Sequence, residues 1–187
     1  MTTQQIPAEW QAKIPDNINP LAPTGFKFDI AKLPSMSFFC QSVNLPAITL
    51  GEPTMGTPFT PIPIPGETLS FGDLTIQFLV DKNMTNYRAL QGWMYGLGFP
   101  QSYQQYVSFQ SLDQIAGPTG GTGPDLTKNY SDASLFILTN NNTENIIVTF
   151  RNIFPTSLES LTFSGTESDV NYLIGSATFR FTYYEFA

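Results

Sequence analysis

The sequence predicts a single, mainly β domain in which one amphipathic helix packs on a sheet. Several segments alternate apolar and polar residues with the period of two that a half-buried strand requires. One segment instead repeats its apolar residues at helical spacing, and prolines gather in a stretch that cannot be a central strand. A chain of 187 residues is long enough to bury a core without disulfides or metals.

The N-terminal part predicts an arm, two strands and a proline-rich ribbon. Residues 1–24 are polar and contain four prolines, so we expect an extended arm, followed by strands at 26–30 and 38–43. Residues 46–66 contain six prolines, and proline cannot donate to a central ladder. This segment is therefore an edge ribbon or a long loop. Its apolar side chains either dock on a neighbouring subunit or fold back over the protein's own core.

The central part predicts a strong strand, the helix and an insertion. Residues 74–80 alternate clearly and end at Asp81. The apolar residues that follow lie on one helical face: Tyr87, Leu90, Met94 and Leu97. We expect Thr85 or Asn86 to cap this helix, and the glycines and proline within 96–100 to end it. Residues 101–131 have a glycine-rich centre and are predicted to be an irregular, mobile insertion.

The C-terminal part predicts a hairpin and a long final strand. Residues 133–138 and 146–154 pair around three asparagines, the chain turns at Pro155, and a short strand follows at 158–164. The final strand, 176–186, places four apolar residues on one face: Ala177, Phe179, Phe181 and Tyr183. A strand of this kind needs a partner, either in its own sheet or in a neighbouring subunit.

The composition narrows the classes of function. Charged residues make up 12% of the chain, where about 25% is usual, and aromatic residues make up 14%. We favour an assembly that hides surface over a β domain solvated by Ser, Thr, Asn and Gln. The net charge of −7 argues against generic nucleic-acid binding through phosphate contacts. Because neither an apolar signal core nor an 18-residue apolar run is present, we expect cytosolic synthesis and no membrane partner.

The residue sets of common active sites are missing. The chain has no histidine, the commonest general base and metal ligand, and its one cysteine, Cys40, lies in an apolar stretch that predicts core packing. The glycine-rich run lacks the lysine of a phosphate-binding loop. The acidic residues lack the spacing of a calcium loop and are expected in solvated turns: Glu159, Glu167, Asp169, Asp125 and Asp132. We expect no enzymatic activity, no cofactor and no metal.

Four stretches, and the order in which they follow one another, resemble the tail-tube protein family of contractile-tailed bacteriophages. They are GFKFDI at 25–30, FCQSVNLP at 39–46, FGDLTIQF at 71–78 with the helix through Trp93, and FRNIFPTSL at 150–158 leading into ATFRFTYYE at 177–185. The resemblance covers about two-thirds of the chain. It implies one domain over 1–187, with an antiparallel β-sandwich or barrel-like tail-tube fold and one flanking helix.

The resemblance also implies a function and partners. Family members form hexameric rings that stack into a hollow tube, which conducts DNA and has no catalytic residues. The expected partners are other copies of the chain, the sheath, baseplate or neck proteins, and DNA that passes through the lumen without specific binding. The expected location is the virion tail, after synthesis in the host cytoplasm. We predict the inter-subunit contacts on the ribbon, at Pro53, Met55, Phe59, Ile62 and Ile64.

Two alternatives remain open at this level. The ribbon and the insertion are longer than a plain tube subunit needs, which also fits a specialised ring, either an initiator at the baseplate or a terminator at the neck. A different class is a β-sandwich module that binds glycans through exposed aromatic residues such as Trp10, Tyr103 and Tyr106. The binding of glycans by the monomer would distinguish this class from a ring-forming protein.

Overall fold

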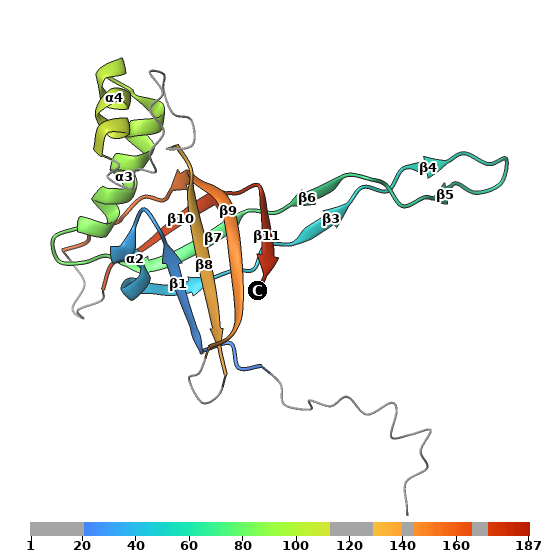
Figure 1. The fold of residues 1–187 in the computed structure, drawn as a ribbon, viewed down its shortest axis with the longest axis horizontal. Helices are drawn as coiled ribbons and strands as arrows, with labels where there is room; N and C mark the ends of the chain where they lie inside the picture. Colours follow the sequence, from blue (N-terminus) through green and yellow to red (C-terminus); the bar gives the residue numbers. More distant parts are fainter. Residues whose placement is uncertain (1–20, 113–128, 140–143, 166–171) are drawn as a thin grey trace, which may run out of the picture.

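The chain forms a branched antiparallel sheet with helices on one side and a long arm on the other (Figure 1). The computed structural model describes residues 21–112, 129–139, 144–165 and 172–187. The strands are β1 (Phe26–Ile30), β2 (Cys40–Val43), β3 (Ile48–Leu50), β4 (Thr54–Met55), β5 (Ile62–Pro63), β6 (Leu69–Phe71), β7 (Leu74–Leu79), β8 (Ser131–Leu138), β9 (Glu144–Leu158), β10 (Ile174–Arg180) and β11 (Tyr183–Phe186). The helices are α2 (Pro34–Phe39), α3 (Thr85–Gly98) and α4 (Tyr103–Leu112).

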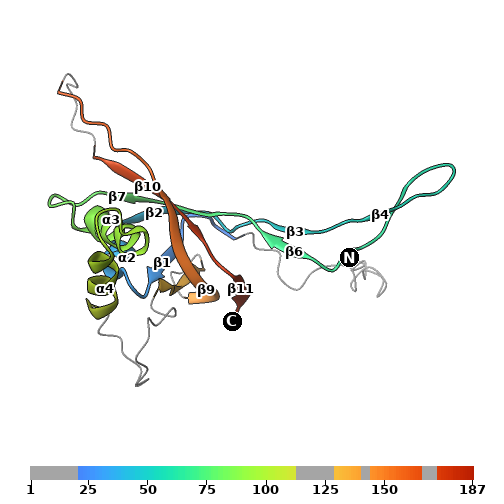
Figure 2. The same ribbon diagram turned by 90° about the horizontal axis from the view of Figure 1, so that it is seen from above.

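The main sheet has seven strands. Six of them follow the order β1-β8-β9-β10-β7-β2, and the seventh, β11, pairs with β9 outside this order. With 15 residues, β9 is long enough to belong to two halves of this sheet. Its first part pairs with β8 and β11, and its last part pairs with β10. The strands of the two halves run across each other (Figures 1 and 2). The predicted mainly β, antiparallel fold is therefore confirmed.

The core consists of alternate residues from the facing halves of the sheet. Its largest fully buried side chains include Phe28, Leu74, Ile76, Phe78, Phe150 and Phe179. Helix α3 contributes Trp93, whose ring centroid lies 6.3 Å from that of Phe179. The burial of Ala177 and Phe179 matches the face predicted for the first part of the final strand. The alternation in the sequence therefore correctly identifies Ala177 and Phe179 as inward-facing.

Helix α3 begins and ends close to the predicted residues, but its start is stabilised differently. The N-cap residue is Met84, whose side chain makes no capping hydrogen bond, and the carboxylate of Asp81 accepts the N–H of Thr85, the first helical residue, at 2.6 Å. Asn86 is buried instead, and its Nδ2 donates to the carbonyl of Leu79 at 2.7 Å. The expectation that Thr85 or Asn86 caps the helix was wrong. Asn86 ties the first turn of the helix to the end of β7.

Two further helices lie where the sequence predicts none. Helix α2 replaces the start of the strand expected at 38–43, and Pro34 stands at its first position, where a missing N–H is tolerated. Helix α4 occupies the beginning of the insertion expected to be irregular at 101–131. The part of this insertion from 113 to 128 lies outside the described residues, as do residues 1–20 of the expected N-terminal arm.

The C-terminal strands differ from the prediction in their continuity. Strand β9 runs through Pro155 without the expected turn, and residues 159–164 are not a strand. The pairing of β10 with β9 shifts register beside Pro155, which accommodates a residue that cannot donate to the ladder. The strand expected at 176–186 is two strands, β10 and β11, separated by a bend. Because of this bend, Tyr183 is exposed and does not continue the buried face.

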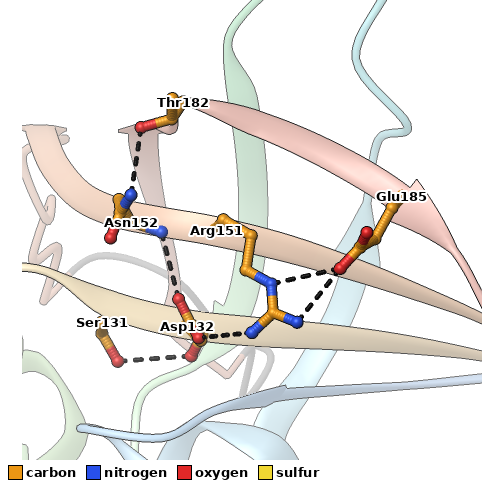
Figure 3. Close-up of polar contacts among 6 residues, drawn as sticks. All are labelled: Ser131, Asp132, Arg151, Asn152, Thr182 and Glu185. Atoms are coloured by element: carbon orange, nitrogen blue, oxygen red, sulfur yellow. Dashed lines mark hydrogen bonds and ion pairs between the residues drawn. The ribbon is translucent and has the colours of Figure 1, made fainter.

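One polar network holds this bend beside a bend in β9 (Figure 3). The guanidinium of Arg151 donates to Asp132 at 2.9 Å and to Glu185 at 3.0 Å, and so joins β9 to β8 and β11. Asp132 also accepts the N–H of Asn152 at 3.1 Å, and Asn152 has a positive φ of 55°. Hydrogen bonds to Asp132 and Glu185 raise the pKa of Arg151. Asp132 is thus a strand residue in an ion pair, not the solvated turn residue we expected.

Candidate assembly surface

Residues 47–72 leave the sheet between β2 and β7 as a long two-stranded arm (Figures 1 and 2). Near the sheet, β3 pairs with β6, and farther out β4 pairs with β5. The arm contains most of the proline-rich ribbon predicted at 46–66. It projects from the core on the side opposite to α3 and α4 (Figure 1).

The five predicted contact residues all lie on the outer part of the arm. Phe59 at the tip is 96% exposed, and Met55, Ile62 and Ile64 are 40–50% exposed. Pro53 is also exposed, and its carbonyl accepts a hydrogen bond from the N–H of Ile64 at 2.8 Å. The ribbon therefore does not fold back over its own core, which was the alternative for this segment. That these residues contact another subunit stays a prediction.

The exposed apolar surface extends farther along the arm than the sequence analysis expected. Ile48 and Leu50 on β3, and Leu69 on β6, are also exposed. Exposed apolar surface is unfavourable in water, and an isolated pair of strands is only marginally stable. Several exposed apolar side chains on such a pair are therefore typical of a surface that another protein covers. The alternation of these residues with Thr49 and Ser70 was the signal that could have identified them.

The tip of the arm is closed by its own hydrogen bonds. The hydroxyl of Thr57 accepts the N–H of Thr60 at 3.2 Å and donates to the carbonyl of the same residue at 2.6 Å. Pro58 and Pro61 restrict the backbone on both sides of Phe59. The turn therefore holds the ring of Phe59 outward without support from the core.

Aromatic side chains anchor the root of the arm on the core. The ring of Phe71, at the end of β6, lies 5.6 Å from Phe181 and 5.5 Å from Tyr184. Both of these rings also contact Phe150, at 5.3 and 5.6 Å. The hydroxyl of Tyr184 donates to the carbonyl of Pro46 at 3.3 Å. The direction of the arm is thus set by the packing around β11, which sequence analysis did not reveal.

The outer face of β7 and β10 carries small uncharged polar side chains. Thr75 lies opposite Thr178, and Gln77 lies opposite Ser176. At the edge of this face, the guanidinium of Arg180 forms an ion pair with Asp73 at 2.5 Å. Because this pairing neutralises the charge of Arg180, the face presents mainly hydroxyl and amide groups.

The chemistry of Cys40 agrees with a packed thiol. It is half-buried against the hydrophobic core, and burial raises the pKa of its thiol to about 11. A thiol with this pKa stays protonated at neutral pH and is a poor nucleophile.

The expected carboxylates do not form a site within the described parts of the chain. Glu159 is exposed, whereas Glu167, Asp169 and Asp125 lie outside the described residues. In the ranges that the structure describes, no three potential metal ligands come together. In those same ranges, no helix is both long and apolar enough to cross a membrane.

The aromatic residues proposed for glycan binding do not form one exposed surface. Tyr103 is exposed, but Tyr106 is buried, so the expectation that Tyr106 is exposed was wrong. The two rings lie 5.8 Å apart and both pack on Phe99. Trp10 lies outside the described residues. Tyr106 therefore serves in the packing of α4.

The same fold occurs in chains of several solved assemblies. A chain of the anti-feeding prophage baseplate superposes with a TM-score of 0.59 at 12% identity, over 91% of this chain and 97% of that one. A chain of the anti-feeding prophage tube terminating cap gives 0.56 at 14% identity, over 95% and 97%. A chain of the sheath/tube terminator of the extracellular contractile injection system PVC gives 0.52 at 14% identity, over 90% and 97%.

Sequence comparison agrees with the fold. The chain is 26% identical over 151 residues to the tail tube terminator protein of Enterobacteria phage T4, covering 78% of this chain and 74% of that protein. No family model matches the chain. The chain is therefore similar in sequence to a phage tail tube terminator and shares its fold with chains of related assemblies, in line with the resemblance of its motifs to tail-tube proteins.

Proposed function

We propose that this protein is a structural subunit of a contractile phage tail and forms a ring at the end of the tail tube. The relationship to the phage T4 tail tube terminator supports this position in the tail. The observation that carries the proposal is the arm, which exposes a strip of apolar side chains that only a neighbouring subunit would cover. The protein acts through association, without catalytic residues, a cofactor or a metal.

The ring contains six copies, as in the tail-tube family that the sequence resembles. Strands β1 and β2 stand at the two ends of the main sheet order, and each pairs on one side only within this order. Unpaired strand edges promote uncontrolled association, whereas a closed ring gives every edge a defined neighbour. Ring formation therefore covers the apolar side chains of the arm and gives the unpaired strand edges a partner.

The ring conducts DNA through its lumen without binding it specifically. The net charge of −7 disfavours adhesion of phosphates. The outer face of β7 and β10 supports this role, since it offers hydroxyl and amide groups and an arginine that Asp73 neutralises. We assign this face to the wall of the lumen. The protein is made in the host cytoplasm and resides in the virion tail, in contact with tube, sheath and neck or baseplate proteins.

Negative-stain electron microscopy of the purified protein, with light scattering on the same sample, tests the proposal. Isolated hexameric rings that do not stack are expected of a subunit at the end of the tube. Stacked tubes would instead indicate a subunit of the tube shaft. A monodisperse monomer at high concentration, which also fails to bind purified tail tubes, would contradict the proposal.

A further inference from the structure

A cavity of about 580 Å³ lies between α3 and α4. One wall is apolar and contains Leu33, Gly92 and Trp93, and the opposite wall contains Gln105 and Ser108 of α4. This volume is within the range of roughly 300–1,000 Å³ that is typical of ligand pockets. It has room for an aromatic side chain together with the polar backbone on both sides of it.

The charge of the cavity limits what it accepts. Lys32 lies at its rim, with its ammonium 5.4 Å from the ring centroid of Trp93. The other residues that line the cavity are uncharged. The indole N–H of Trp93 donates to the carbonyl of Asn129 at 3.2 Å, so the polar atom of this ring is satisfied within the subunit. The lining therefore favours an uncharged group in which an apolar ring lies between polar backbone or side-chain groups.

The tip of the arm has these properties. Residues 53–65 contain no Asp, Glu, Lys or Arg. Phe59 is 96% exposed, and the hydrogen-bonded turn at Thr57 holds it outward. The ring matches the apolar lining at Leu33 and Trp93, and the uncharged flanks of the tip agree with the uncharged polar wall of α4. Because the turn is formed before contact, little conformational entropy is lost on insertion.

The two features lie at opposite ends of the molecule in both perpendicular views, with the arm on one side and α3 and α4 on the other (Figures 1 and 2). The tip therefore does not reach the cavity of its own subunit. We propose that Phe59 of one copy inserts into the α3–α4 cavity of a second copy. This inference rests on the proposed ring function and names the contact that joins its subunits. The contact is heterologous, and contacts of this kind form rings when the rotation between copies closes.

Two variants change the two sides of the proposed contact one at a time: one fills the cavity and the other removes the tip ring. Gly92→Leu adds a side chain at a position that lines the cavity and where a Cβ meets nothing within 4 Å. Leucine also favours helix more than glycine, which protects folding. Gly98→Leu is the matched control, because Gly98 also lies on α3 in open space but does not line the cavity. Phe59→Ala removes the tip ring.

Sedimentation of concentrated samples measures the effect of these variants on association. Gly92→Leu and Phe59→Ala are each expected to weaken it by about tenfold or more, as for a central aromatic contact, and Gly98→Leu to leave it unchanged. A mixture of the two defective variants still has one intact tip and one intact cavity. It should form a one-to-one complex that does not grow further. Two variants that were merely misfolded would form none.

Cross-linking tests the contact directly, whether or not rings are visible. In a Cys40→Ser background, Thr60→Cys beside the tip ring and Gln104→Cys on the cavity wall are joined with a short bismaleimide. A ladder of linked copies is expected for this pair and not for Thr60→Cys with Lys82→Cys. Linked copies without rings would support the contact and contradict the ring function. Rings or tubes that persist in Phe59→Ala and Gly92→Leu, without specific cross-links, would overturn the contact and leave the ring function standing.

Discussion

The branched sheet and the arm use the same kinds of apolar side chain with opposite results. Phe150 and Phe179 are fully buried between the halves of the sheet, whereas Phe59 on the arm is almost fully exposed. Both regions consist of antiparallel strands, so strand formation alone does not decide burial. What differs is whether a second layer covers the strands. Apolar surface in the sheet stabilises the subunit, and apolar surface on the arm is available for association.

The arm keeps its direction because its root belongs to the sheet. Phe71 packs on Phe181 and Tyr184, which lie at and after the bend between β10 and β11. Beyond this anchor, β4 and β5 pair only with each other. Changes in the sheet should therefore affect unfolding, and changes on the outer arm should affect assembly alone. Substitutions in the sheet, at the start of α3 and on the arm test this separation, and they follow in order of their expected effect on stability.

The largest loss is expected from Phe179→Ala in the sheet. Removing a fully buried phenylalanine should lower the free energy of unfolding by about 3–5 kcal/mol. Phe181→Ala should cost less than this, because Phe181 is only half-buried at the bend. Urea denaturation followed by circular dichroism measures both values. A loss below about 1 kcal/mol for Phe179→Ala would contradict its place in the core.

Gly175→Ala tests how closely β10 approaches β7. A Cβ at this position would lie 2.7 Å from the ring of Phe78, so the buried ring must move. We expect a loss of about 1–3 kcal/mol in the free energy of unfolding, the usual cost of overpacking. Gly98→Ala is the control, since a Cβ there meets open space and alanine favours helix. Equal stabilities for the two variants would show that Phe78 adapts freely.

A smaller loss is expected at the start of α3. Asp81→Ala removes the carboxylate that accepts the N–H of Thr85, and the free energy of unfolding should fall by about 1 kcal/mol. Asp81→Asn keeps an acceptor oxygen and should recover most of this loss. Thermal unfolding of both variants provides the measurement. If both lose the same amount, the hydrogen bond is not the cause.

The smallest effect on stability is expected from Ile62→Asp on the arm. The change in the free energy of unfolding should stay within about 0.5 kcal/mol, because the side chain is already half exposed. Assembly should be lost, since a buried, unpaired carboxylate is costly at an interface. Ile62→Val is the conservative control and should assemble. Normal assembly of a folded Ile62→Asp protein would remove this part of the arm from the interface.

Local patterns in the sequence were sufficient for some of these features. Alternation identified the buried faces of β7 and the first part of β10, and apolar spacing located α3. The prolines indicated a ribbon outside the central sheet, which the arm confirms. These predictions succeed because alternation, helical spacing and the missing proline N–H act over a few neighbouring residues.

Other features required contacts between distant residues. Arg151 is 19 residues from Asp132 and 34 from Glu185, and this network accompanies the break between β10 and β11 that alternation did not predict. The same limit applies to the division of β9 between two halves of the sheet. The cavity between α3 and α4 exists only once both helices are placed.

The sequence by itself determined the mainly β class, the buried faces of β7 and the first part of β10, the position of helix α3 and the ribbon that bears Phe59 and Ile62. Only the tertiary structure decided that this ribbon projects from the core, and that its tip and the α3–α4 cavity lie at opposite ends of the subunit. The physical reason is the distance in sequence over which each interaction acts. Side-chain period and backbone restriction act locally, whereas the direction of the arm depends on Phe71, Phe181 and Tyr184, which meet only in the folded chain.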